Sequence, residues 1–176
     1  MKLDIGCDSN KKEGFIGVDK FKLKGVDILA DINKRLPFKI NSVDAIYCSH
    51  VLMYSKNIDF TLKEFYRVCK PGAIIEIKVP HFSSHTSVSE FTLIRFRYMV
   101  LFSGYIKNSN HYEAKEKNEG LFIQLDKKLV FEKGPLFFYN RILEPIFNKI
   151  PHYYERSFLK ALFPAYEIYL KLKVVK

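Results

Sequence analysis

Short apolar runs, separated by polar segments, recur along the first half of the chain and predict five strands. The segments between them contain Gly, Pro, Asn and Ser, residues that favour turns. Short apolar strands linked by loops and helices are typical of a mainly parallel sheet covered on both faces. The strands are expected at Leu3–Ile5, Phe15–Val18, Val26–Ala30, Val43–Cys48 and Ala73–Val79.

A helix is predicted from Asn57 to Cys69, where apolar positions fall at helical spacing before Lys70-Pro71-Gly72 ends it. The second half of the chain is less regular. There the pattern predicts a helix over Phe91–Phe102, a polar surface loop or lid over Asn108–Glu119, and strands at Leu129–Lys133 and Tyr166–Val175.

The stretch from Leu3 to Asp19 combines a strand, a tight glycine turn and a second strand that ends on an acid. Ligands of open α/β sheets bind beyond the carboxyl ends of the strands, so Gly6 and Asp19 would face one crevice. A glycine lets a ligand approach the backbone, and a carboxylate can accept two ribose hydroxyls. The alternative is an ordinary β-turn followed by an exposed acid.

The composition of the 176 residues, 48% of them apolar, predicts a globular chain with a substantial core. No apolar run approaches the roughly 18 residues of a membrane span, and no signal peptide is expected. Cys7, Cys48 and Cys69 lack metal-type spacing, which favours a reduced cytoplasmic location. The net charge of +10 suits nucleic acid, anionic lipid or a phosphorylated substrate, but the scattered lysines favour a solvated surface.

Six pieces of the first half occur in a characteristic order between Leu3 and His81. They are LDIGCD, GVD ending at Asp19, Asp31 followed by Leu36-Pro37-Phe38, Asp44-Ala45-Ile46, Ser49-His50-Val51-Leu52, and Arg67 to Gly72. Together they resemble the type 11 group of class I S-adenosylmethionine-dependent methyltransferases.

The resemblance implies a Rossmann-like α/β core, with a mainly parallel seven-stranded sheet and helices on both faces, trimmed at the N-terminus. It implies one domain over residues 1–176, with a cofactor-binding half at 1–81 and an acceptor-side half at 82–176. A helical insertion at about 139–162 would belong to the acceptor side.

The resemblance also implies S-adenosylmethionine as cofactor and gives each site residue a role. Asp19 would accept the ribose hydroxyls, Lys20 would flank the adenine, and Asp31 and Ile32 would also lie at the adenine. The methionine part would meet the first loop and the end of the fourth strand, through Asp4, Gly6, Cys7, Asp8, Ser49 and His50.

The first loop departs from the family pattern in two ways. Asp8 stands where a second glycine is usual, and its charge would either hinder backbone approach or hold the ammonium group of the cofactor. The interval from Cys7 to Gly14 is too short for the usual helix, which also argues against a dinucleotide-binding turn. Reduced cofactor affinity or activity is therefore an open alternative.

Methyl transfer from a sulfonium is an in-line displacement in which positioning supplies much of the acceleration. A base is needed only if the acceptor must lose a proton. Candidates are His50, His81 and His85, with His81 first because the acceptor usually enters just past the fifth strand; the alternative is that they are ordinary loop residues. No metal site is expected, since His81 and His85 lack a third ligand nearby.

The predicted function is methyl transfer to a small-molecule, glycan or lipid-precursor acceptor by a monomer or homodimer. The alternatives are an RNA acceptor, and a cofactor-binding regulatory relative without transfer activity. The aromatic segment Tyr139–Leu162, predicted as two helices separated by Pro151, is expected to pack on the sheet. Capping the acceptor pocket, making a dimer contact and touching a membrane surface are its other possible roles.

Overall fold

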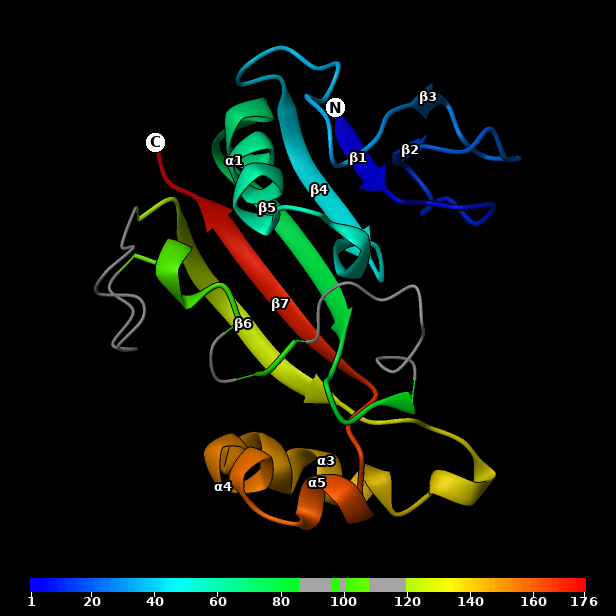
Figure 1. Cartoon of the computed structure of the whole chain (residues 1–176), viewed down its shortest axis with the longest axis vertical. Helices are drawn as coiled ribbons and strands as arrows, with labels where there is room; N and C mark the ends of the chain where they lie inside the picture. The colour runs from blue at the N-terminus through cyan, green and yellow to red at the C-terminus, as the bar shows by residue number, and fades with distance from the viewer. Residues whose placement is uncertain (86–95, 99–100, 108–119) are drawn as a thin grey trace.

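A computed structural model describes residues 1–85, 96–98, 101–107 and 120–176. Seven strands form one sheet in the order β3-β2-β1-β4-β5-β7-β6 (Figure 1). All pairings are parallel except those of β7, which runs antiparallel to both β5 and β6. The mainly parallel seven-stranded sheet is thus confirmed. The strands are β1 (Lys2–Ile5), β2 (Ile16–Asp19), β3 (Ile28–Leu29), β4 (Val43–Ser49), β5 (Cys69–Pro80), β6 (Phe122–Val130) and β7 (Glu167–Val174).

Helix α1 begins where predicted, after Asn57, whose side chain accepts a hydrogen bond from the Phe60 backbone N–H at 3.0 Å. Its apolar side chains Leu62, Phe65 and Val68 are buried, as the helical spacing requires. The helices are η1 (Leu52–Tyr54), α1 (Ile58–Val68), η3 (Ser103–Tyr105), η4 (Pro135–Phe137), α3 (Asn140–Lys149), α4 (Pro151–Arg156) and α5 (Leu159–Leu162). Among the described residues, none of these helices has the length and apolar content to cross a bilayer.

The second half of the chain corrects several predictions. Strand β6 starts at Phe122, well before the predicted Leu129, because pairing with β7 outweighs its polar sequence. Most of the predicted helix Phe91–Phe102 lies outside the described residues, and within it Phe96 forms a bridge with His81 instead. The polar segment Asn108–Glu119 also lies outside the described residues.

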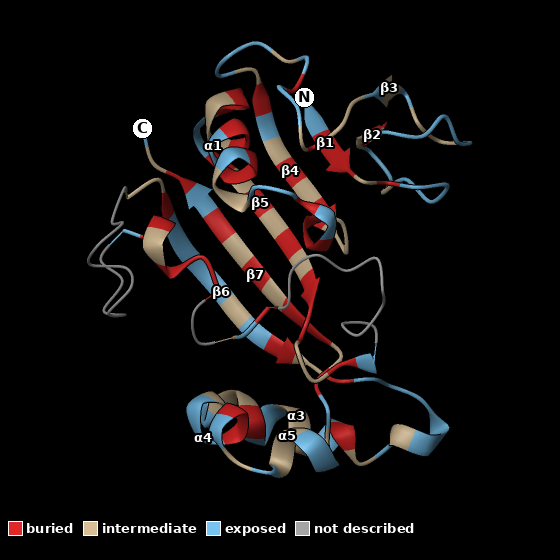
Figure 2. Ribbon diagram, viewed as in Figure 1, coloured by how far each residue is buried: buried red, intermediate tan, exposed pale blue. Residues whose placement is uncertain are grey.

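The two faces of the sheet differ in burial (Figure 2). Cys48, Ile77 and Leu170 point to the core and are fully buried, whereas their neighbours along the strands are partly exposed. Parallel sheets are normally covered on both faces by crossover helices. Here the β1–β2 and β2–β3 connections contain no helix, so among the described elements only the α1 face has the expected helical cover.

Long side chains partly cover the other face instead. The Lys12 ammonium lies 4.0 Å from the Tyr47 ring centroid and 5.0 Å from that of Phe15, and it pairs with Glu76 at 3.2 Å. The aliphatic stem of a lysine can shield apolar surface while its charge stays in water. This face has only partial cover because the β1–β2 and β2–β3 connections contain no helix.

Helices α3, α4 and α5 lie beyond the ends of β6 and β7 (Figure 1). The Asn148 side chain accepts from the Leu129 N–H at 2.7 Å and donates to its carbonyl at 2.8 Å, so α3 satisfies part of the β6 edge. Pro151 begins α4, where its missing N–H costs nothing. The predicted break at Pro151 is present, but the segment holds three short helices, not two.

Candidate functional site

The carboxyl ends of β1, β2, β4 and β5 meet at one edge of the sheet, as parallel pairing requires. Because β7 is antiparallel, its first residue lies at the same edge, where Glu167 pairs in register with Pro80. This edge therefore brings Gly6, Asp19 and Ser49 to the same side of the molecule as Glu167. It is the candidate site.

Gly6 has a positive φ of 72°, which favours glycine. A Cβ at this position would lie 2.5 Å from the Cβ of Val51, so a side chain would clash with the segment after β4. The glycine therefore brings the His50–Val51 segment against β1. This contact differs from the predicted ligand approach, because Val51 occupies the space that a Cβ would fill.

Asp4 and Cys7 contact the rest of this loop and the neighbouring strand β2. The buried Asp4 carboxylate accepts the Lys12 backbone N–H at 2.8 Å; burial raises its pKa, and the bond from Lys12 partly offsets that rise. A Cβ at Gly17 would lie 2.9 Å from the Cys7 Sγ, which is thus packed against β2. Both side chains hold the loop in place.

Asp19 lies at the tip of β2 and receives two backbone donors. Its Oδ2 accepts from the Asp8 N–H at 3.1 Å, and its Oδ1 accepts from the Phe21 N–H at 3.0 Å. A carboxylate has about four lone-pair sites, so both oxygens retain acceptor capacity for hydroxyl groups. Asp8 has a φ of 48°, so it adopts the backbone conformation that the usual glycine would favour.

Asp31 follows β3 beside this loop. Its Oδ1 accepts from the backbone and the side-chain nitrogen of Asn33, at 2.9 and 3.2 Å, and the preceding Ala30 N–H donates to the Asp19 carbonyl at 2.9 Å. Ile32 is buried in the core, and the exposed Lys20 places its ammonium 4.7 Å from the Phe21 ring centroid. The two acids thus share one edge, whereas Ile32 points inward.

His50, just after Ser49 at the end of β4, forms the best-defined polar contact at the site. Its Nε2 lies 2.7 Å from the Glu167 Oε2, and the Lys78 ammonium lies 3.3 Å from the other oxygen. Burial acts to raise the pKa of Glu167, but the His50 bond and the Lys78 charge outweigh it, so the pKa is lowered. Glu167 is thus an ionised carboxylate that orients the His50 imidazole.

Tyr166 completes this group, with its ring centroid 5.7 Å from that of His50 and 6.2 Å from that of His85. Lys78, Tyr166 and Glu167 were not among the predicted site residues. The available signal was the acid Glu167 at the start of a predicted strand. Its partner, His50, lies 117 positions earlier, so the sequence does not show the contact.

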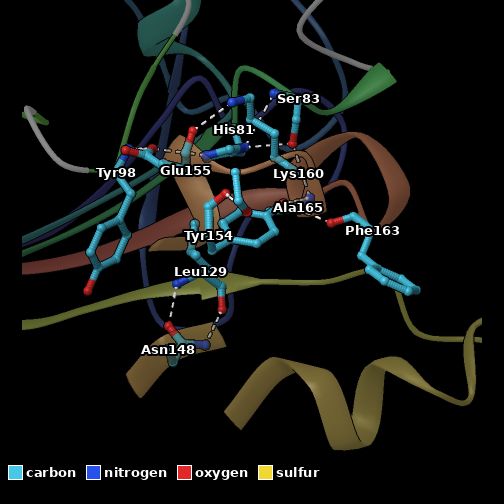
Figure 3. A network of polar contacts seen from close by, with 11 residues as sticks. His81, Ser83, Tyr98, Leu129, Asn148, Tyr154, Glu155, Lys160, Phe163 and Ala165 are labelled. Atoms are coloured by element: carbon cyan, nitrogen blue, oxygen red, sulfur yellow. Dashed lines mark hydrogen bonds and ion pairs between the residues drawn. The ribbon is translucent and has the colours of Figure 1, made fainter. Parts of the chain in front are cut away.

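His81, the predicted base, lies in a different environment (Figure 3). Its side chain is fully buried, with Nδ1 at 2.8 Å from the Ser83 hydroxyl and Nε2 at 3.1 Å from a Glu155 carboxylate oxygen. Burial is the main cause of its lowered pKa. The His81 side chain thus has no exposed surface, and both of its ring nitrogens are engaged. Its geometry is that of a positioning residue.

Within the part of the chain that the structure describes, no group of three His, Cys, Asp or Glu side chains is arranged to hold a metal ion.

Comparison with known proteins agrees with this geometry. Residues 4–77 match the methyltransferase domain family. The resemblance to class I S-adenosylmethionine-dependent methyltransferases is confirmed. S-adenosylmethionine is the cofactor that this match implies, and the fit at Asp19 is consistent with it because both oxygens can accept further donors.

Solved structures show the same fold at low sequence identity. An S-adenosylmethionine-dependent methyltransferase from Archaeoglobus fulgidus has a TM-score of 0.59 and 17% identity, covering 98% of this chain and 85% of its own. The putative methyltransferase crystallised with the Haloferax volcanii activator Trm112 gives a TM-score of 0.58 and 14% identity, with 99% and 81% coverage.

Another neighbour, the [4+2]-cyclase SpnF, has a TM-score of 0.56 and 16% identity, covering 99% of this chain and 74% of its own. The fold therefore also occurs in a protein named for a different reaction. No curated protein sequence matches the chain.

Proposed function

We propose that this protein transfers a methyl group from S-adenosylmethionine to a small-molecule, glycan or lipid-precursor acceptor bound beside His50. The observation that carries the proposal is the 2.7 Å contact between His50 and Glu167 at the carboxyl edge of the sheet. The His50–Val51 segment packs directly on Gly6 of the first loop. An acceptor at His50 would therefore lie next to the loop expected to hold the cofactor.

Asp19 would hold the cofactor by accepting its ribose hydroxyls, and Asp31 would lie at the adenine amino group. The Gly6–Asp8 loop, Ser49 and the His50 backbone would surround the methionine portion. When bound, S-adenosylmethionine supplies a methyl group on a positively charged sulfur. Since Asp19 already binds two backbone N–H groups, it would fix the loop and the ribose together.

His50 would act as the general base. With Nε2 directed at Glu167, its Nδ1 can take the proton that a hydroxyl or amine acceptor loses on methylation. The ionised Glu167 would stabilise the resulting imidazolium, and Lys78 would keep Glu167 ionised. We propose His50 rather than the predicted His81 because the His50 side chain is 28% exposed and that of His81 is fully buried.

Calorimetry tests the cofactor part. Asp19→Ala is expected to weaken S-adenosylmethionine binding by about 10- to 100-fold, because hydrogen bonds to a charged group contribute roughly 1.5–3 kcal/mol. Asp44→Ala, which removes an exposed carboxylate paired with Lys70 at the opposite edge, is the matched control. Unchanged affinity in Asp19→Ala would reject the assignment.

A labelled-methyl assay tests the transfer. The protein is incubated with methyl-labelled S-adenosylmethionine and separated small-molecule, glycan, lipid and RNA fractions. We expect label outside the RNA fraction, and a loss of about 100-fold in turnover for His50→Gln without weaker cofactor binding. Label in RNA would favour the RNA alternative, and cofactor binding without any transfer would favour the regulatory one.

We also propose a cytoplasmic location. Its support is chemical: Cys7, Cys48 and Cys69 are free thiols, as expected in a reducing compartment.

A further inference from the structure

The segment 136–162, which spans η4 to α5, exposes an unusual number of large apolar side chains; we call it the helical platform. Leu136 is 83% exposed, Tyr153 76% and Phe158 72%. Isolated exposed apolar residues are normal, but a concentration of them marks an interaction surface. The platform holds eight of the seventeen exposed large apolar residues in the described chain: Leu136, Phe138, Ile142, Ile146, Ile150, Tyr153, Phe158 and Leu162.

The platform does not need these side chains for its own packing. Its inner side already has an aromatic core, in which the Phe147 and Tyr154 ring centroids lie 4.9 Å apart and those of Phe131 and Tyr154 lie 5.5 Å apart. On α3, Ile142 and Ile146 are exposed while Phe147 is buried. A helix that is apolar on its outer side as well as its inner side is suited to a second apolar environment.

The charges on the platform and its flanks select that environment. Lys133, Arg141, Lys149 and Arg156 are exposed. The two acids between residues 133 and 163 are engaged: Glu144 accepts the Phe131 N–H at 2.9 Å and pairs with Lys133, and Glu155 is fully buried against His81. The outward charge is therefore positive. Apolar side chains among exposed cations are typical of surfaces that bind anionic lipid.

The platform is fixed to the candidate site. Glu155 of α4 contacts His81 just past β5, and Asn148 of α3 contacts Leu129 near the end of β6. The helices consequently lie beyond the carboxyl ends of these strands, on the acceptor side of the sheet (Figure 1). A partner bound to the platform would therefore lie close to the carboxyl edge of the sheet, where the candidate site is.

We infer that the helical platform binds the surface of an anionic lipid bilayer. Its apolar side chains enter the boundary between headgroups and acyl chains, and Arg141, Lys149 and Arg156 contact headgroup phosphates. A second copy of this chain is a poorer occupant, because two such platforms would bring like charges together. The inference does not depend on methyl transfer.

Vesicle flotation tests it on the full chain without cofactor or acceptor. We expect the protein to float with vesicles of phosphatidylcholine and phosphatidylglycerol, and to be released from them as salt is raised. Tyr153→Ser with Phe158→Ser should reduce the partition at least tenfold. The matched control is Ile40→Ser with Leu125→Ser, two exposed apolar residues outside the platform, which should leave it unchanged.

The charges are tested separately. Replacing Arg141, Lys149 and Arg156 with Gln should lower the partition about fivefold per charge, since each basic residue near an anionic surface contributes about that factor. Lys22, Lys24 and Lys39, exposed elsewhere, are the matched control set. Circular dichroism checks that each variant is folded.

Two results would overturn the inference. One is an equal partition of platform and control variants. The other is a protein that does not bind vesicles but forms a concentration-dependent dimer, measured by sedimentation, which the Tyr153→Ser, Phe158→Ser variant does not form. That result would identify the platform as a protein interface.

Discussion

Two histidine–glutamate pairs lie at the carboxyl edge of the sheet, and they differ mainly in exposure. His50 and Glu167 are 2.7 Å apart, with side chains 28% and 7% exposed. His81 and Glu155 are 3.1 Å apart, and both side chains are fully buried. Each pair joins a histidine that follows a parallel strand to a carboxylate from the last third of the chain.

The difference shows that burial, rather than residue type, separates their roles. A general base must reach a proton on the acceptor; of the two paired histidines, His50 has exposed surface and His81 has none. The His81 pair fixes the chain after β5 to α4, with the Tyr98 N–H donating to the same Glu155 oxygen. In the proposed function the exposed pair would supply the base, whereas the buried pair joins the segment after β5 to α4.

The largest expected effect is on stability. Glu155→Ala should lower the free energy of unfolding by about 3 kcal/mol, because buried donors on His81 and Tyr98 lose their acceptor. Glu167→Ala, at the less buried pair, should cost only about 1 kcal/mol. Urea unfolding followed by circular dichroism measures both. Equal losses would contradict the distinction between the pairs.

The pH dependence of stability should separate the pairs next. Burial lowers the pKa of His81 below its usual 6.5, so the unfolded chain binds the proton more readily. Its contribution to stability is therefore complete above about pH 6.5 and is lost as the pH falls below that value, with a slope of up to about 1.4 kcal/mol per pH unit.

Glu167 should affect the pH dependence of stability in a lower pH range than His81 does. Its pKa lies below the usual 4.5, so its contribution is present above that pH and is lost on further acidification. Urea unfolding from pH 7.5 to 5.0 should show a decline that His81→Gln removes and Glu167→Gln leaves. His152→Gln, an exposed histidine of the same helix as Glu155, serves as the control. An unchanged decline in His81→Gln would refute this origin.

The smallest expected effect on stability is that of Lys78, which pairs with Glu167 of the exposed pair. Lys78→Met removes a 3.3 Å ion pair with Glu167 and should cost about 0.5 kcal/mol, as is usual for partly exposed pairs. Lys171→Met, which removes a 3.7 Å pair with Glu76 on the same face of the sheet, should cost no more. Thermal unfolding of the two variants provides the comparison. A loss above 2 kcal/mol for Lys78→Met would instead indicate a structural role like that of Glu155.

The first half of the fold could be predicted because its signals are local. Apolar runs place β1, β2, β4 and β5, and the spacing of Ile58, Leu62 and Phe65 places α1. The sequence places Asp19 and Asp31 at strand ends because each directly follows a predicted strand, and the structure has both at the carboxyl edge of the sheet. Strand β6 was placed too late, since its sequence from Ile123 to Lys128 is mostly polar and owes its extended form to pairing with β7.

The chemistry of the acceptor side could not be predicted in the same way. Whether a histidine is exposed depends on segments that are distant in sequence, and Glu155 lies 74 positions after His81. His81 and His50 look alike in the chain, since each follows an apolar strand. Only the packing of α4 over one of them makes it inaccessible.

The position of β7 affects how this site forms during synthesis. It is the last strand of the sheet in sequence, yet it lies between β5 and β6. A ribosome therefore releases β5 and β6 before the strand that joins them exists, and both remain without that neighbour until it emerges. Because Glu167 is its first residue, His50 acquires its carboxylate partner only at that stage. Under the proposed function, the strands that carry Asp19 and Asp31 would therefore be complete before His50 could act as a base.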